Sequence, residues 1–491
     1  MKKIVLCISL PLLIVASVPF WVGGEVEDRF LLQTKNIQQQ LFREHGVTLE
    51  VIRYQRGYLS ALADTQFTFD PQAVSLLPAS SSQVTEPVTI MLRHQISHGP
   101  WIGKRFSRQI MSKVETTLVA INGEQSTLDF YFPDQPAFSS TTWLAWSGAI
   151  NGHGGMPAYS GRDHSGQYDL QWGGLHFEFD GDWVALRGHG RFNSPRFELS
   201  NASHGVTIGG LSGEFSRLIS PSGLSLGNGK FTLNSFRIRA ERRNGSPQRV
   251  LLRDIVVAHH ATQRMEVVDL QQQFDFRLLQ LNGEQFNNGS LHIELSSLDA
   301  GVLQSLQRRY EQMTKTELAD PALLRQLWLQ EAQQVLPTLL AQGPAIHISK
   351  AEVTTDTGAI SARLRLAIRN SAPTPELTAF PAGLAALLPY IEIEFDITLP
   401  ESMIVQQAQK AVREKIVEQL QETEQTMTPE VLSQQTKRAA EQMLTQFEIQ
   451  KILRHVNGSF RVLLRYRKGR LYLNGLPADH LLNMLPPLKE S

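Results

Sequence analysis

The sequence nearly lacks cysteine: Cys7 is the only one among 491 residues. A single thiol forms no disulfide within the chain, so packing and hydrogen bonds must hold the fold together. Cys7 also lies inside an apolar run, where we expect it to behave as one more apolar side chain. These facts exclude a disulfide scaffold, and they exclude thiol catalysis anywhere outside that run.

Neither sign of charge is in excess, because Lys plus Arg and Asp plus Glu each number 47. A surface that binds nucleic acid normally shows a basic excess or stripe, so we expect no nucleic-acid partner. The densest basic cluster alternates with apolar residues, as on the solvent face of a strand. It comprises Arg461, Arg465, Arg467, Lys468 and Arg470.

Motifs of the common catalytic and nucleotide sites are also lacking. Residues 223–230 resemble a phosphate loop, but the glycine spacing is wrong and Phe231 stands where Ser or Thr should bind magnesium. Residues 210–213 lack the second glycine of a nucleophile elbow, and no zinc-protease helix motif occurs. We therefore expect a non-enzymatic protein with no cofactor and no metal.

The most informative feature present is an apolar run, residues 4–22, behind Lys2 and Lys3. A helix of about 19 residues extends roughly 28 Å, close to the hydrocarbon thickness of a bilayer. We expect residues 1–23 to be a transmembrane signal anchor. Positive charge before the run keeps the N-terminus in the cytoplasm and exports the rest of the chain.

A cleavable secretory peptide is the alternative to an anchor, because both begin with basic residues before an apolar core. The best cleavage site is Val15-Ala16-Ser17, a mediocre match. Phe20 and Trp21 instead form an aromatic pair where an anchor would meet the membrane interface. The aromatic pair favours the anchor.

Residues 24–46 are predicted to form an amphipathic juxtamembrane helix. Val26, Phe30, Ile37 and Leu41 recur at spacings of four, seven and four, which places them in one narrow stripe. This helix could pack on the body of the protein or pair with a second copy of itself. Packing on the body is the more ordinary outcome.

Residues 47–300 show a period of two and are predicted to form a mainly antiparallel sheet of sequential hairpins. Asn-Gly and Asp-Gly pairs between alternating runs are strong hairpin signals, because both residues tolerate positive φ. The predicted turns are Asn122-Gly123, Asp180-Gly181, Asn228-Gly229, Asn244-Gly245 and Asn282-Gly283. The glycine-rich stretch 148–161 is interpreted as a flexible loop that could cover a site.

Residues 301–491 are predicted to complete the same body. A helix is expected over 303–340, with Asp320-Pro321 at a helix start and Gly343-Pro344 at its end. Strands 360–368 and 391–397 carry Arg and Asp or Glu respectively on their polar faces, so cross-strand ion pairs are expected if they are neighbours. A helical hairpin, 402–420 and 429–453, and a strand pair, 460–466 and 470–473, follow. The fold class is α+β.

Two histidines four residues apart raise the question of a metal site. His94 and His98 would share a helix face, but residues 88–92 and the stop at Gly99-Pro100 indicate a strand and its exit. On a strand, positions four apart lie about 13 Å apart, too far for one metal. We expect a structural role, with His98 bonding backbone in a turn opened by Gly99.

Several short motifs resemble those of the YdgA-like family of proteobacterial envelope proteins. They lie at residues 54–60 (Tyr-Gln-Arg-Gly-Tyr-Leu-Ser), 94–100 (His-Gln-Ile-Ser-His-Gly-Pro), 291–306 and 466–475. The resemblance implies a single-pass protein of the bacterial inner membrane with a periplasmic body, and it offers no established biochemical activity to carry over. The residues of uncertain role in these motifs are Tyr54, Arg56, Gly57, Ser60, His94, His98, Gly99, Pro100, Asn474 and Gly475.

Gly57 is expected to permit a bulge or tight bend, and Arg56 to pair with a carboxylate or with lipid headgroups. The leading functional hypothesis is a non-enzymatic envelope protein whose body binds a hydrophobic client, possibly lipid, or a protein client. One alternative is an assembly factor acting through protein contacts or homodimerisation. The other is a hydrolase whose carboxylates are assembled from distant sequence.

Overall fold

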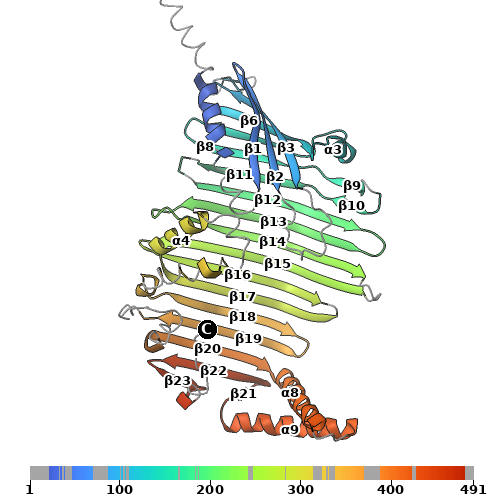
Figure 1. Cartoon of the computed structure of the whole chain (residues 1–491), viewed down its shortest axis with the longest axis vertical. Coiled ribbons are helices and arrows are strands. Elements are labelled where there is room, and N and C mark those ends of the chain that lie inside the picture. The colour runs from blue at the N-terminus through green and yellow to red at the C-terminus, as the bar shows by residue number, and fades with distance from the viewer. Residues whose placement is uncertain are drawn as a thin grey trace, which may run out of the picture. The chain divides into compact units, whose positions relative to one another are not determined.

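The computed structural model (Figure 1) describes most of the chain after the apolar run. The described residues are 21–32, 34–35, 38, 47–69, 87–99, 101–102, 105–106, 110–163, 166–182, 184–185, 187–241, 247–281, 283–312, 323, 325–327, 330, 335, 338–369, 388–422 and 427–480. The predicted anchor up to residue 20 lies outside them, as do Ile37, Leu41, Pro100, Asn244-Gly245, Asn282 and Asp320-Pro321.

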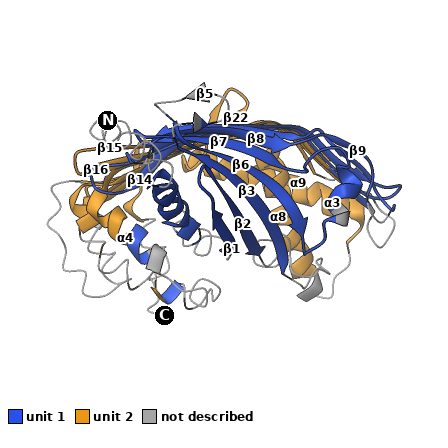
Figure 2. Cartoon of the chain, turned by 90° about the horizontal axis from the view of Figure 1, so that it is seen from above, with its two compact units in different colours: residues 1–234, 238–241, 307–326 blue, residues 235–237, 242–306, 327–491 orange. Residues whose placement is uncertain are grey.

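The chain divides into two units (Figure 2). Unit 1 comprises residues 1–234, 238–241 and 307–326, and unit 2 comprises residues 235–237, 242–306 and 327–491. Strand β14 (Ser225–Glu241) and helix α4 (Ala300–Gln312) contain residues of both units.

Unit 1 is built on an antiparallel sheet in which most strands pair with their neighbours in sequence. The pairing order is β1-β2-β3-β6-β7-β8-β11-β12-β13, and β10 joins β12 to β9. The strands are β1 (Thr48–Arg56), β2 (Ser60–Phe69), β3 (Val88–His98), β6 (Ile110–Ile121), β7 (Ser139–Ala145), β8 (Ala149–Met156), β9 (Tyr159–Arg162), β10 (Asp169–Trp172), β11 (Leu175–Asp182), β12 (Arg187–Ser200) and β13 (Gly205–Ile219). A two-stranded ribbon, β4 (Trp101–Ile102) and β5 (Arg105–Phe106), and helix α3 (Ser126–Tyr131) complete it.

Unit 2 is also a sheet of sequential antiparallel strands. The order is β15-β16-β17-β18-β19-β20-β22-β23-β24, with β21 on β22. The strands are β15 (Pro247–Arg264), β16 (Val267–Leu281), β17 (Glu284–Asp299), β18 (Ala345–Thr355), β19 (Gly358–Ile368), β20 (Ile391–Pro400), β21 (Arg454–Val456), β22 (Ser459–Arg467), β23 (Arg470–Leu473) and β24 (Leu476–Pro477). A 3-10 turn, η1 (Leu388–Tyr390), precedes β20.

Helices α8 (Glu401–Glu422) and α9 (Pro429–Ile449) form the predicted hairpin of unit 2. Their contact is apolar, with Ala408 packed against Ala440 and Leu444. Thr428 is the N-cap and Pro429 begins α9, where proline costs nothing because the first N–H has no helical partner. The prediction of a helical hairpin is confirmed.

The prediction of a large antiparallel β body is confirmed by both sheets, and the turn predictions are confirmed in part. Asn122-Gly123 has positive φ at both residues, and Gly283 is also positive. Asp180-Gly181 and Asn228-Gly229 were predicted as turns wrongly, because they lie inside β11 and β14. At Gly181 the absent side chain serves close packing: a Cβ would lie 2.6 Å from the Arg187 carbonyl oxygen.

The interpretation of residues 148–161 as a flexible loop is wrong. Most of them form strand β8, which pairs on both sides with β7 and β11. Its glycines make room for aromatic rings, since a Cβ on Gly152 would lie 2.5 Å from Phe179 Cζ and a Cβ on Gly154 would lie 2.7 Å from Phe177 Cζ. Phe177 and Phe179 stack with ring centroids 6.4 Å apart.

Substituting Gly154 by alanine should destabilise unit 1. The new Cβ would lie 2.7 Å from the Ser139 carbonyl oxygen and 2.5 Å from Ser140 Cβ, so strand β7 must shift. Overpacking of this kind costs about 1–3 kcal/mol. Urea denaturation should show that loss for Gly154→Ala. Gly188→Ala is the matched control, because its Cβ would meet nothing nearer than 3.5 Å. Equal stability of the two variants would contradict this packing.

The helix expected over 303–340 begins earlier than predicted. Helix α4 starts at Ala300, and Asp299 Oδ1 accepts a hydrogen bond of 2.8 Å from the Val302 N–H. Asp299 therefore satisfies one of the free N–H groups at the helix start, and this capping signal was missed in the sequence. The predicted end is confirmed, because Gly343 has φ of 66° and donates to the Leu340 carbonyl.

Candidate functional site

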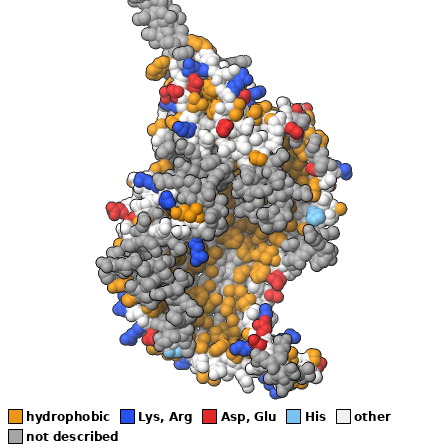
Figure 3. Space-filling view, in the orientation of Figure 1, with side chains coloured by type: hydrophobic (Ala, Val, Ile, Leu, Met, Phe, Trp, Pro, Cys, Tyr) orange, Lys and Arg blue, Asp and Glu red, His pale blue; other side chains and the backbone are white. Residues whose placement is uncertain are grey.

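One face of the unit 2 sheet is apolar across successive strands. Directly opposite residues in the register share a face, and one row is Ile348, Leu364, Phe395 and Leu464 on strands β18, β19, β20 and β22. Figure 3 shows hydrophobic side chains gathered over these strands, in the lower part of the view. We call the apolar side of strands β15–β22 the unit 2 apolar face.

A second row of this face lies on strands β15, β16 and β17. Val257 is opposite Phe274, and Phe274 is opposite Leu291. These side chains are 40%, 39% and 37% exposed, and Ile346 on β18 is 40% exposed. Large apolar side chains opposite one another and more than a third exposed form a patch, which differs from scattered apolar residues on an ordinary surface.

The opposite face of the same sheet is charged. Asp396 of β20 accepts hydrogen bonds of 2.7 and 2.6 Å from Arg461 of β22, and Glu394 accepts one of 2.8 Å from Arg465. Glu392 bonds both Arg369 and Arg467, at 2.9 and 3.1 Å.

These ion pairs change the pKa of two carboxyl groups. The hydrogen bonds from Arg461 hold the pKa of Asp396 below its ordinary value. Burial alone would raise the pKa of Glu392, but hydrogen bonds from Arg369 and Arg467 outweigh it and lower the pKa. Strands β19 and β20 are neighbours, with Arg363 opposite Asp396, so the condition for the expected cross-strand ion pairs is met. Asp396 accepts its hydrogen bonds from Arg461 of β22, which belongs to the basic cluster interpreted as a solvent face.

A serine, a histidine and an aspartate meet on strands β16 and β17, but their geometry differs from a catalytic triad. Ser290 Oγ lies 3.1 Å from His292 Nε2, and Asp275 Oδ1 lies 3.2 Å from the same nitrogen. A triad needs the aspartate on the other ring nitrogen, where it orients the imidazole. Ser290 instead donates to Asp275 at 2.5 Å, so its hydroxyl proton is held by the carboxylate.

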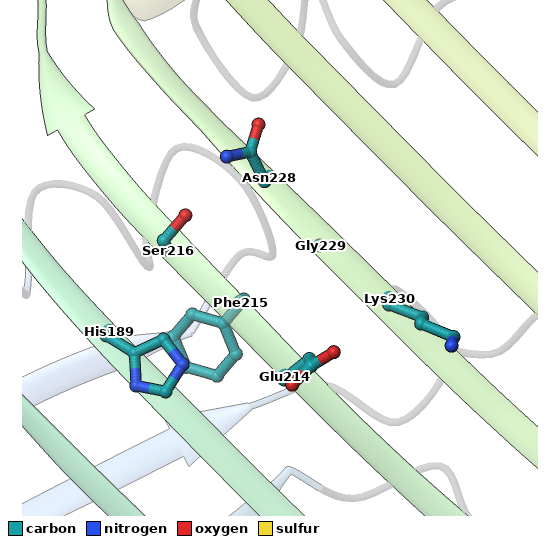
Figure 4. Close-up of a pocket in the computed structure, with 7 residues that line it drawn as sticks. All are labelled: His189, Glu214, Phe215, Ser216, Asn228, Gly229 and Lys230. Atoms are coloured by element: carbon teal, nitrogen blue, oxygen red, sulfur yellow. The ribbon is translucent and has the colours of Figure 1, made fainter.

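Shallow hollows lie on the described sheets, and three of them contain charged or titratable side chains. One of about 210 Å³ lies over β12, β13 and β14 in unit 1 (Figure 4) and is lined by His189, Glu214–Ser216 and Asn228–Lys230. A second lies beside it over β8 and β11 and includes His153 and Glu178. The third, over β15–β17 in unit 2, includes His259, His260 and His292. Each is smaller or more open than the enclosed clefts that bury small ligands.

Unit 1 has an apolar face of its own, and a helix covers part of it. Residues 21–32 are helical, and Val22 and Val26 pack on Ala61, Ala63 and Ile96 of strands β2 and β3. The prediction that this amphipathic helix packs on the body is confirmed for its first three turns. We call residues 21–32 the N-terminal helix.

Four of the residues singled out by the family resemblance, Tyr54, Arg56, His94 and His98, lie beneath the N-terminal helix. Phe30 contacts the rings of both Tyr54 and His94, with centroids 5.7 and 5.3 Å apart. Arg56 forms an ion pair of 3.0 Å with Glu27 of the helix. Of the two partners predicted for Arg56, a carboxylate or lipid headgroups, the structure shows the carboxylate. Burial, with Glu27 nearby, raises the pKa of Tyr54 to about 12.

The short motif at 57–60 makes the turn between β1 and β2. The Gly57 N–H donates to the Ser60 carbonyl at 2.7 Å, so the tight bend predicted at Gly57 is confirmed. Leu59, in the same turn, accepts a hydrogen bond of 3.0 Å from the His98 N–H. The turn is thereby tied to the end of strand β3.

His94 is held in the sheet by two threonines. Its ring nitrogens lie 2.8 Å from Thr65 Oγ1 and 2.9 Å from Thr116 Oγ1, on the strands to either side of β3. Burial lowers the pKa of His94 to about 4, although Asp64 nearby favours the charged form. These threonine partners were not identified from the sequence, because strand register alone brings them together.

His98 is fully buried at the end of β3, and its N–H bonds backbone, as predicted, at the Leu59 carbonyl of the β1–β2 turn. Neither ring nitrogen has a hydrogen-bond partner among the described residues. The Ser60 carbonyl lies near the ring and partly opposes the shift, but burial dominates and lowers the pKa of His98. The ring instead fills the space under Gly23, while Gly99 has φ of 103° and bonds Met111.

Gly23 should be needed for the N-terminal helix to dock. A Cβ there would lie 2.7 Å from His98 Cε1, and His98 is 0% exposed. Gly23→Ala should therefore increase hydrogen exchange of the helix amides, at a cost of about 1–3 kcal/mol. Gly24→Ala is the control, since its Cβ would meet only the flexible end of Arg56, at 3.3 Å. Unchanged exchange in Gly23→Ala would refute the contact.

The last motif residues are structural. Asn474 Oδ1 accepts from the Leu463 N–H at 2.8 Å, and its amide nitrogen donates to the Lys451 and Ile452 carbonyls at 2.8 and 2.9 Å. Asn474 and Gly475 both have positive φ, 48° and 86°. The pair closes the turn after β23 and ties it to the segment after α9.

The described residues contain no group of three or more His, Cys, Asp or Glu placed to hold a metal ion. Within the same part of the chain, no helix combines the length and apolarity needed to cross a bilayer.

Comparison with known proteins gives one match. The model of a family described as bacterial protein of unknown function (DUF945) matches residues 1–479. No curated protein and no solved structure matches the chain.

Proposed function

We propose that the chain, which belongs to DUF945, a bacterial family of unknown function, is a non-enzymatic envelope protein that binds lipid acyl chains. Its own structure supplies the support for this function. The occupied surface would be the unit 2 apolar face. The observation that supports this proposal is the cross-strand row of Val257, Phe274 and Leu291. Their apolar side chains are each more than a third exposed.

The dimensions of this face suit an acyl chain. Neighbouring strands lie about 4.8 Å apart, so the seven strands β15–β20 and β22 extend roughly 29 Å across. One leaflet of a bilayer is about 15 Å of hydrocarbon, half the thickness of the core. An extended acyl chain therefore fits along the rows without leaving the apolar side chains.

The sequence supplies a reason for lipid rather than another hydrophobic client. Residues 4–22 are an apolar run long enough to cross a bilayer. We propose that this run anchors the protein in the bacterial inner membrane, with the body on the periplasmic side. A body tethered there lies beside a large excess of lipid, which favours occupation by mass action.

The chemistry of the described residues supports binding rather than catalysis. Ser290, His292 and Asp275 lack triad geometry. The carboxylates of β20 are engaged by arginines, which favours their charged, structural state over proton transfer.

Mass spectrometry of extracted lipid tests the proposal. The full chain would be purified in detergent, and its lipid compared with that of a control in which residues 1–46 are fused to an unrelated soluble domain. Lipid in molar excess over the control supports binding by the body. If the amount of lipid equals that of the control, the proposal of lipid binding is refuted. A protein that co-purifies reproducibly without excess lipid would favour the assembly-factor alternative.

A further inference from the structure

We propose that the edge of the unit 1 sheet carrying Tyr58, Leu59 and Trp146 rests on the headgroup layer of a lipid bilayer. This inference rests on the membrane anchoring in the proposed function, and it is independent of lipid binding by unit 2. It adds a contact between the folded body and the bilayer to the one made by the N-terminal anchor.

Strand register places these residues on one edge. Tyr58 and Leu59 lie in the turn between β1 and β2, and Ser60 is opposite Ser97 near the end of β3. His98 is opposite Ser112 at the start of β6. Ile110 of β6 is in turn opposite Ala145, the residue before Trp146. Successive antiparallel pairs thus bring the β1–β2 turn, the end of β3 and the β7–β8 turn to the same end of the strands.

The residues at this edge are large, apolar and exposed. Tyr58 is 53% exposed, Leu59 41% and Trp146 46%. The next turn along the edge, between β11 and β12, presents Val184 at 71%. We call this the apolar edge.

The opposite edge of the same sheet has a different character. Two of its described turns are polar: Asn122, Gly123 and Glu124 after β6, and Asn201–His204 between β12 and β13. The described part of this edge also presents one exposed apolar ring in helix α3, that of Phe130. Figure 1 shows α3 and the N-terminal helix on opposite sides of unit 1. The asymmetry indicates that one edge faces a different medium.

The chain itself identifies that medium as a bilayer. Trp21 lies at the end of the apolar run, one residue before its last, and is 84% exposed at the start of the N-terminal helix. Gly23, two residues later, lies against the His98 ring, and the His98 N–H bonds the Leu59 carbonyl. The point where the run enters the body is therefore adjacent to the apolar edge.

The side-chain chemistry matches the membrane interface. Trp and Tyr are enriched there because an apolar ring enters the acyl region while the N–H or O–H stays hydrated. Trp21, Tyr58 and Trp146 provide three such rings, and Leu59 adds an exposed aliphatic side chain.

The test uses the full chain with Cys7→Ser, so that one introduced cysteine carries a fluorophore. Tyr58→Cys and Trp146→Cys place the label on the apolar edge. Ala202→Cys places it on the exposed turn of the opposite edge. Each protein would be reconstituted into vesicles of phosphatidylethanolamine and phosphatidylglycerol, a fraction of which carry a nitroxide on the headgroup, and vesicle flotation would confirm incorporation.

Quenching at positions 58 and 146 should exceed quenching at position 202 several-fold. Equal quenching at all three positions in chains that float would overturn the proposal and leave a tether alone. Failure of the chain to float would overturn it together with the anchor. Leu291→Asp, made in the labelled background, should retain the quenching pattern, so loss of bound lipid in unit 2 is distinguishable from loss of this contact.

Discussion

Leu291→Asp should abolish the molar excess of lipid that co-purifies with the body. Leu291 is 37% exposed in the middle of the register row with Phe274, so the new carboxylate can remain hydrated in the empty protein. An acyl chain along the row would have to displace that water. Desolvating a charge without a partner costs several kcal/mol, and each 1.4 kcal/mol is about a tenfold loss of affinity. The lipid should therefore fall to the level of the anchor-only control.

Gln271→Asp is the matched control for that substitution. It introduces the same charge on the neighbouring strand β16, where Gln271 is exposed and opposite Glu294 on the polar face. Lipid content should be unchanged. The new carboxylate lies directly opposite Glu294, so a destabilisation of roughly 0.2–1 kcal/mol is expected for Gln271→Asp without loss of lipid. Equal lipid in Leu291→Asp and the parent would show that the unit 2 apolar face is not the binding surface.

Much of the β architecture was predictable because alternation is a local signal. Strands β19, β20 and β22 were located from their period of two, and the opposite charges on β19 and β20 are compatible with the pairing that the structure shows. The turns were less predictable. Asn-Gly and Asp-Gly pairs mark backbone that can take positive φ, but Gly181 and Gly229 lie in strands. Glycine was read as a turn signal where it was needed for close packing.

The stretch around Gly152 was also misinterpreted from composition, because its glycines lie in a strand and not in a loop. Its glycines resemble a loop because composition carries no information about the partner strand. The reason for them is on β11, where Phe177 and Phe179 lie flat over Gly154 and Gly152. These phenylalanines lie more than twenty positions from the glycines in the sequence, so only the strand pairing shows why glycine is needed there.

The candidate site was predictable as a class of surface but not as a set of residues. Alternation indicated an apolar face on a large sheet, yet which apolar residues align in a row depends on register and on bulges such as that between Ile348 and Ala351. Beneath the N-terminal helix, the motif residues Tyr54, Arg56 and His94 were identified without a common role. The structure brings them together as the seat of that helix.

Burial of His94 beneath the N-terminal helix should make unit 1 less stable in acid. Burial lowers the pKa of His94 to about 4, from 6.5 in an unstructured chain. The unfolded chain therefore binds a proton at a higher pH than the folded one, so folding is disfavoured as pH falls. The stabilising effect of a neutral His94 is fully present above about pH 6.5 and is lost progressively down to about pH 4.

The expected size of this loss is about 3 kcal/mol, since each unit of pKa shift corresponds to about 1.4 kcal/mol. Burial also lowers the pKa of His98, which adds to the loss in the same direction. Urea denaturation of the full chain in detergent at pH 7 and pH 4.5 would measure the combined fall. His94→Gln should reduce that fall, because the amide stays neutral and can still bond Thr65 and Thr116.

His204→Gln is the control for that variant, because His204 lies on an exposed turn between β12 and β13. It should retain the full acid sensitivity of the parent. If His94→Gln and the parent lost the same free energy of unfolding between pH 7 and pH 4.5, the buried neutral imidazole would not be the source. With the expected result, protonation of His94 would weaken the contacts that hold Phe30 and the N-terminal helix on the sheet. Acid would then loosen the packing of the N-terminal helix on the unit 1 sheet.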